Sequence, residues 1–134
     1  MIALALALAA SIPSATPSQV IRLYYAAINR RQYGTAYRYW SDHGRASGKS
    51  LSAFAAGFAR TRSASVFIGR VDRPEGAAGS LYVTVPVRVE ARLSNGNAQR
   101  FAGSYTLRRI NDVPGATREQ LEWHIASAKL RPVL

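Results

Sequence analysis

The chain has 134 residues, the length of one ordinary domain, and no cysteine, which excludes a disulfide framework and a thiolate metal site. It carries 18 basic and 7 acidic residues, which gives a net charge of +11. Such an excess attracts polyanions, although the basic residues are scattered, as they are on an ordinary solvated surface.

Residues 1–15 are apolar and uncharged, and this run is too short to cross a bilayer as a helix, which needs about 20 residues. The run is typical of the hydrophobic core of a secretory signal, with Ala7-Leu8-Ala9 as one cleavage pattern, but no positive charge precedes it. We therefore expect an exported, periplasmic protein with one mature domain over residues 16–134. An ordinary N-terminus without a targeting role is the alternative.

The first half of the mature chain predicts three helices. Thr16 and Gln19 form a capping box around Pro17, and apolar residues recur at helical spacing from Val20 to Ile28, which predicts a first helix as far as residue 31. A second short helix is expected over residues 32–40. A loop over residues 41–49 then leads to a third helix over residues 51–60, which Ser50 caps.

The second half alternates apolar and polar residues, which predicts strands at residues 63–73, 81–93, 98–110 and 121–131. Asn95-Gly96 is a two-residue hairpin signal, and residues 74–79 are expected to form a loop. Pro86 lacks a ladder donor, so an edge or a bulge is expected there. This order predicts an α+β fold, in which N-terminal helices pack on the concave face of a curved, mainly antiparallel four-stranded sheet.

Three packing motifs point to a family. They are Tyr24-Tyr25-Ala26-Ala27-Ile28, then Tyr33-x-x-Ala36-Tyr37, then Phe54-x-x-x-Phe58. Together with the order of elements, these motifs make residues 16–131 of the chain resemble the nuclear transport factor 2-like superfamily, whose members are cone-shaped, cystatin-like domains. That superfamily includes ketosteroid isomerases, polyketide cyclases, epoxide hydrolases, dehydratases, transport factors and exported modules of unknown role. The resemblance therefore implies a fold more than an activity.

The resemblance also implies a pocket between the helices and the concave sheet face. The residues expected to line it are Tyr24, Tyr37, Trp40, Phe54, Val85, Val87, Tyr105 and Trp123. A small apolar ligand is a candidate occupant of such a pocket. No cofactor is expected, and two histidines without cysteine give no recognisable metal-ligand spacing.

Isomerase-like members of the superfamily use a carboxylate base in an apolar pocket together with a hydroxyl donor. In this chain the alternation places no acidic residue on the inward sheet face. Asp42, next to His43, remains as the candidate base, with Tyr24 as the candidate donor. A solvated loop is the competing interpretation of Asp42 and His43, because loops are mostly exposed.

The outward face of the predicted sheet is basic. Its arginines are Arg88, Arg92, Arg100 and Arg108. Strict alternation on the last strand places Ser127 inward and His124 outward, provided that no bulge intervenes. Such a face is either solvated or an interaction surface for a second copy, a partner protein or an anionic component of the cell envelope. Nucleic acid is disfavoured because no aromatic ladder is interleaved with the arginines.

These observations predict a non-catalytic binding or accessory module of the bacterial cell envelope, with an apolar pocket and a basic outer sheet face. The alternative is a small cofactor-free enzyme of the isomerase or cyclase type, which would use Asp42 and a tyrosine in the apolar pocket. The lack of an inward acid on the predicted sheet favours the first interpretation.

Overall fold

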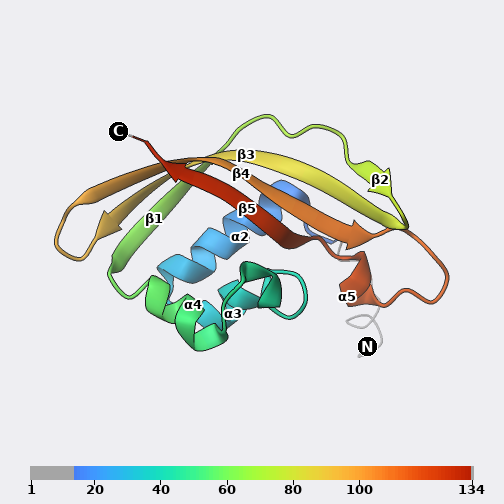
Figure 1. Ribbon diagram of the computed structural model, residues 1–134, viewed down its shortest axis with the longest axis horizontal. Coiled ribbons are helices and arrows are strands. Elements are labelled where there is room, and N and C mark those ends of the chain that lie inside the picture. The colour runs from blue at the N-terminus through green and yellow to red at the C-terminus, as the bar shows by residue number, and fades with distance from the viewer. Residues whose placement is uncertain (1–13, 134) are drawn as a thin grey trace, which may run out of the picture.

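The computed structural model describes residues 14–133 and confirms the α+β prediction. Figure 1 shows one layer of helices beneath the concave side of an arched sheet. The helices are α2 (Pro17–Asn29), α3 (Tyr33–Arg38), the 3-10 helix η1 (Arg45–Ser47) and α4 (Leu51–Gly57). Residues 1–13 of the predicted export segment lie outside the described residues. Within residues 14–133, no helix combines the length and the apolar character that a membrane span requires.

The predicted capping box starts α2. The Thr16 hydroxyl accepts from the backbone N–H of Gln19 at 3.2 Å, and the Gln19 side chain accepts from the Thr16 N–H at 2.8 Å. At its other end α2 is tied to the sheet, because the Asn29 side chain exchanges two 2.8 Å hydrogen bonds with the backbone of Ala64. These contacts fix both ends of the longest helix.

The sheet is antiparallel and has five strands, one more than expected. The strands are β1 (Thr61–Ile68), β2 (Glu75–Ala77), β3 (Ser80–Leu93), β4 (Ala98–Ile110) and β5 (His124–Pro132). Their order is β1-β3-β4-β5. The short strand β2 pairs with residues 80–82 of β3, along the same edge of β3 that pairs with β1 further on. The additional strand forms because Ala78 and Gly79 both take positive φ, 49° and 85°, which is the geometry of a tight hairpin turn.

Pro86 lies where one side of β3 becomes an edge. Its carbonyl accepts from the backbone N–H of Gly69 at 2.9 Å, just after β1 ends at Ile68. The missing proline N–H therefore points to the side on which β1 has ended, and the pairing of β3 with β4 continues past it. The edge expected from the sequence is present.

A β-bulge near the start of β5 corrects the predicted register. Leu107 pairs with Ile125, but Thr106 pairs with Ser127, so Ala126 is an extra residue on β5. Ser127 consequently faces outward with Thr106, and the predicted inward position was wrong. The physical reason is the bulge, which reverses the facing of every later residue on the strand.

The start of β5 was also predicted too early. Residues 118–121 form a short helix, α5 (Arg118–Leu121), which begins with a second capping box between Thr117 and Gln120. The strand itself begins at His124. The first residues of β5 also pair with residues 39–41, along the strand edge that faces away from β4. There Trp40 and Ile125 form a parallel bridge.

The core lies between α2 and the inward residues of the sheet. Its fully buried side chains include Ile21, Val85, Leu107 and Ile125, each 0% exposed. Aromatic rings from α2, α3, α4 and β4 complete this core. The concave face is therefore packed against helices, and the opposite, convex face of the sheet is left to solvent (Figure 1).

Candidate binding surface on the convex sheet face

The residues predicted to line an apolar pocket mostly form the core. Of those residues, all except Trp123 are buried. Their rings contact one another: the centroids of Tyr37 and Phe54 are 5.3 Å apart, and those of Tyr24 and Tyr105 are 6.1 Å apart. Much of the space under the sheet is thus filled by the protein's own side chains.

A small cavity of about 170 Å³ remains beside this cluster. It brings together three of the predicted pocket residues, Tyr24, Trp40 and Phe54. Phe58 and Lys49 also line it. Trp123 lies elsewhere: it lines a separate depression near Ala15, Val20 and Tyr39, and the Arg109 guanidinium lies 5.5 Å from the centre of its ring.

Buried hydroxyl groups mark the centre of the aromatic cluster. The hydroxyls of Tyr25 and Tyr105 form a 2.5 Å hydrogen bond. Burial raises the pKa of Tyr25 to about 12 and raises the pKa values of Tyr24 and Tyr105 further above the ordinary value. Among residues 14–133, the indole N–H of Trp40 is the buried side-chain group without a hydrogen-bond partner. The phenols of Tyr25 and Tyr105 are therefore neutral near pH 7 and bond to each other inside the core.

Asp42 and His43 lie in an unusual loop. Both take left-handed backbone angles, φ 57° and 55°, and Gly44 follows at φ 97°. Gly44 is required there, because a Cβ would lie 2.2 Å from the ring of Tyr37. Left-handed non-glycine residues carry strain, which is held here by backbone bonds such as the one from the Ser41 N–H to the Ile125 carbonyl at 2.8 Å.

Asp42 is paired with an arginine and exposed. Its carboxylate accepts two hydrogen bonds from Arg45, at 2.8 and 3.1 Å, and its side chain is 64% exposed. The hydrogen bonds from Arg45 hold the pKa of Asp42 below its ordinary value, which makes it a weaker base. Tyr24 lines the small aromatic cavity and Asp42 lines a different one, so the structure does not bring the candidate base and donor together.

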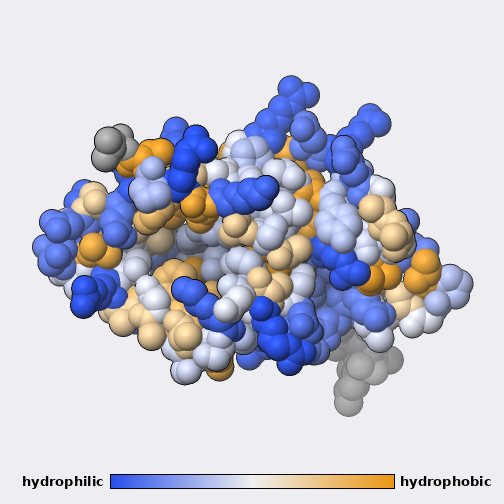
Figure 2. All heavy atoms as spheres, in the orientation of Figure 1, coloured by the Kyte–Doolittle hydropathy of each residue, from blue (hydrophilic) through white to orange (hydrophobic). Residues whose placement is uncertain are grey.

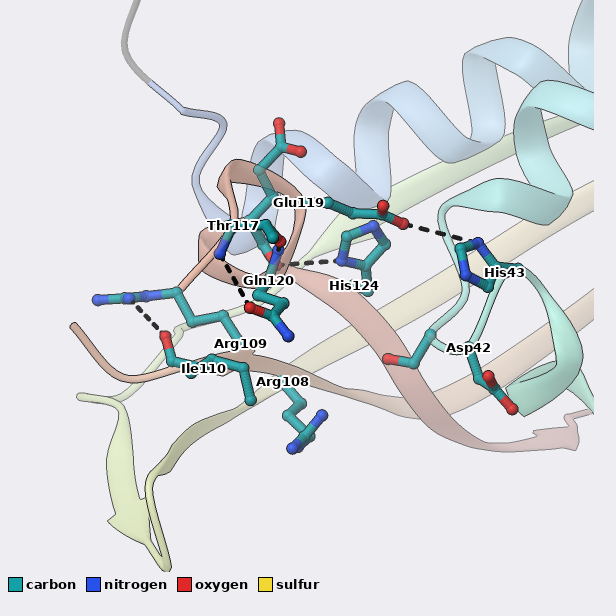
Figure 3. Close-up of a pocket in the computed structure, with 11 residues that line it drawn as sticks. Asp42, His43, Arg108, Arg109, Ile110, Thr117, Glu119, Gln120 and His124 are labelled. Carbon is teal, nitrogen blue, oxygen red and sulfur yellow. Dashed lines mark hydrogen bonds and ion pairs between the residues drawn. The ribbon is translucent and has the colours of Figure 1, made fainter. Parts of the chain in front are cut away.

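The cavity next to Asp42 is polar and has a volume of about 440 Å³ (Figure 3). It lies between residues 41–43, the end of β4 and the α5 segment, and it contains both histidines of the chain. His43 Nδ1 lies 3.7 Å from a carboxylate oxygen of Glu119, and His124 Nδ1 lies 3.1 Å from the carbonyl of Glu122. Within residues 14–133, no group of three or more histidines and carboxylates could hold a metal ion.

The register places the predicted arginines on the convex face. On β3, Arg88 and Arg92 alternate with buried valine and alanine, and their pairing partners on β4 are Ala102 and Ala98. The Arg88 guanidinium lies 5.1 Å from the centre of the exposed Phe67 ring. Figure 2 shows hydrophilic side chains projecting from this upper side of the molecule.

The other two arginines have polar neighbours. Arg100 lies 4.0 Å from Glu90, and both side chains are more than half exposed, so this ion pair is weak. Arg108 donates from Nε to the hydroxyl of Ser80 at 3.1 Å. Both guanidinium groups retain further N–H donors for a ligand.

The bulge adds two cations that the sequence analysis missed. Lys129 pairs with Ser104 and Arg131 pairs with Ala102, so both face outward. One signal could have revealed them: without a bulge, Ser127, Lys129 and Arg131 would all point into the core, and lysine and arginine are almost never buried unpaired.

We call the outward residues at this side of the sheet the β4–β5 strip. They are Ala102, Ser104, Thr106, Arg108, His124, Ser127, Lys129 and Arg131. None of these described residues is acidic, and hydroxyl groups lie between the cations. The strip can therefore offer both positive charge and hydrogen bonds to an anionic chain.

Comparisons of the sequence and structure with protein-family models, curated proteins and solved structures found no match.

Proposed function

We propose that the protein is an exported, non-catalytic binding module of the bacterial cell envelope, built as a nuclear transport factor 2-like cone. Its function is to hold an anionic polymer on the β4–β5 strip. The observation that carries this proposal is that Arg108, Lys129 and Arg131 lie on outward positions of β4 and β5, and that the residues of the strip include no carboxylate.

The charge distribution supports this assignment. Lys129 and Arg131 lie on the strip away from the acids Asp42, Glu119 and Glu122, which line the cavity at the Arg108 end. Cations placed in this way produce a positive potential that raises the local concentration of polyanions. On the neighbouring strand, by contrast, Glu90 lies next to Arg100 and reduces the local charge. The strip is thus the part of the convex face that is best suited to bind an anion.

A cofactor-free enzyme is the weaker candidate. Asp42 is exposed and paired with Arg45, and Tyr24 lines a different cavity. A general base needs a raised pKa and a position within reach of the donor and the substrate. The placement of these two residues meets neither requirement.

The test removes charge from the strip without changing its shape. Lys129→Gln combined with Arg131→Gln should weaken binding to polygalacturonate and to polyglutamate, measured by calorimetry at about 20 mM and about 200 mM salt. Wild-type affinity should fall steeply between these two salt concentrations, because exposed charges are screened. Arg22→Gln combined with Arg30→Gln is the matched control, since both arginines are exposed at α2 on the other side of the sheet.

The control should bind almost as tightly as the wild type. If it loses as much affinity as the strip variant, the binding reflects net charge alone and the strip has no special role. Binding that does not change with salt would also contradict the proposal.

A further inference from the structure

The β4–β5 strip and the polar cavity form one continuous surface. Arg108 and His124 are pairing partners on β4 and β5, and both also line the cavity. From Arg108 to Ala102, β4 advances six residues, or about 20 Å at about 3.3 Å per residue. An extended ligand could therefore lie along the strip with one end in the cavity.

The cavity suits a ligand with many hydroxyl groups. Figure 3 shows His43 and Glu119 facing each other across it, with His124 and Gln120 nearby. Carboxylates accept hydrogen bonds, while amides and neutral imidazoles both donate and accept them. A hydroxyl also donates and accepts, so it can pair with each of these groups. A volume of about 440 Å³ lies within the range of small-ligand sites.

The carboxylates distinguish this end from the strip. Asp42, Glu119 and Glu122 line the cavity, and they would repel a ligand whose only property is negative charge. The same groups would stabilise a ligand that presents hydroxyl donors there and places its anionic groups further along, near Lys129 and Arg131.

The strip itself excludes other ligand classes. Tyr82 on β3 is exposed and pairs with Arg108 beside the strip, but the strip itself has no phenyl, phenol or indole ring on which successive nucleic-acid bases could stack. It also has no large apolar side chain to anchor a protein partner or to enter a lipid layer. Its side chains are small, hydroxyl-bearing or cationic, apart from the His124 imidazole at the cavity end.

We propose that the ligand is an acidic oligosaccharide, whose terminal sugar binds in the polar cavity and whose following carboxylate-bearing sugars lie along the β4–β5 strip. This inference rests on the proposed function, because it assumes that the strip binds polyanions. It adds the class of the ligand and the direction in which the ligand lies.

The experiment compares two acidic probes of equal length: a galacturonic acid tetramer and a glutamate tetramer. Calorimetry at about 50 mM salt measures their affinity for the wild type, for the Lys129→Gln, Arg131→Gln double variant, and for Glu119→Ala and Glu119→Gln. Glu119 is exposed, with 62% of its side chain accessible, so its replacement should leave the fold intact. Circular dichroism checks this.

Glu119→Ala separates the two explanations by the sign of its effect. Removing a negative charge should tighten the binding of any ligand that is recognised by charge alone. Loss of a hydrogen bond between Glu119 and a sugar hydroxyl should instead weaken galacturonate binding about tenfold, while glutamate binding does not weaken. Glu119→Gln keeps an acceptor oxygen and should recover part of the lost affinity.

The outcomes divide clearly. Weakened galacturonate binding in Glu119→Ala, together with weakened binding of both probes in the strip variant, supports the inference. If Glu119→Ala tightens both probes equally, the strip still binds polyanions but the oligosaccharide inference is overturned. If neither probe binds the wild type, the proposed function and this inference both fail.

Discussion

The hydrogen bond between Tyr25 and Tyr105 joins α2 to β4 inside the core. The two hydroxyl oxygens are 2.5 Å apart, and the residues are 6% and 3% exposed. Tyr25→Phe leaves the Tyr105 hydroxyl buried without this partner, which costs about 1–3 kcal/mol of the free energy of unfolding. Tyr105→Phe should cost a similar amount for the same reason. The double variant removes both hydroxyls, so we expect it to cost less than the two single changes added together.

The same pair predicts a loss of stability at high pH. Burial raises the pKa of Tyr25 from 10.0 to about 12, so the folded state favours the neutral phenol more than the unfolded state does. The resulting stabilisation is fully present below pH 10 and is lost as the pH rises to about 12. A shift of this size corresponds to roughly 3 kcal/mol, because one pKa unit is worth about 1.4 kcal/mol.

Urea unfolding followed by tryptophan fluorescence measures both effects. The wild type, the two single variants and the double variant are compared at about pH 7 and about pH 11. Tyr25→Phe should lose less stability between these pH values than the wild type does, since it lacks one of the ionising groups. Single-variant costs that add up in the double variant would refute the coupling. A wild-type stability that is equal at the two pH values would refute the burial argument.

Three further predictions concern the backbone and the surface. Gly103→Ala should destabilise the protein by about 3 kcal/mol in urea unfolding, because a Cβ at this position would lie 1.8 Å from the Lys129 carbonyl oxygen on β5. An unchanged unfolding midpoint would mean that β4 and β5 can move apart at this point without a loss of stability. Asn29→Ala should cost about 1–2 kcal/mol, since it removes both hydrogen bonds to the Ala64 backbone, and amide hydrogen exchange should show faster exchange of the Ala64 N–H. Arg45→Ala should raise the pKa of Asp42 toward its ordinary value, as measured by carboxyl-carbon NMR titration; an unchanged pKa would show that the pair does not form in solution.

The local signals of the fold could be predicted from the sequence, because they act within a few residues. The Thr16–Gln19 capping box depends on adjacent backbone and appears where expected. Asn95-Gly96 marks the hairpin, but the predicted two-residue turn was wrong: the loop spans residues 94–96, because Gly96 takes a positive φ of 88° while Asn95 does not, and the Leu93 N–H donates to the Asn97 carbonyl at 2.9 Å. The turn at Ala78 was missed because alanine rarely takes a positive φ, so Ala-Gly is a weak hairpin signal. The short helix before β5 was missed because a four-residue helix has too few residues to show a helical period.

The candidate site depended on contacts between distant segments. Alternation alone was sufficient to place Arg88 and Arg92, since β3 runs without a bulge between them. Lys129 and Arg131 could not be placed in the same way, because an extra residue on β5 is set by its pairing with β4. The filling of the predicted pocket follows from how rings on four elements pack together, which no single stretch of sequence encodes.

The pairing of residues 39–41 with the start of β5 has a consequence for how the molecule meets other copies of itself. An open strand edge exposes unpaired N–H and C=O groups and invites edge-to-edge aggregation. Here Ile125 accepts from the Ser41 N–H and donates to the Tyr39 carbonyl, both at 2.8 Å, so the first part of that edge is already occupied. The remainder of β5 carries Lys129 and Arg131 and ends at Pro132, and charge and proline are both features that discourage strand addition. The cations that we assign to ligand binding would thus also protect the chain from self-association while the ligand is absent.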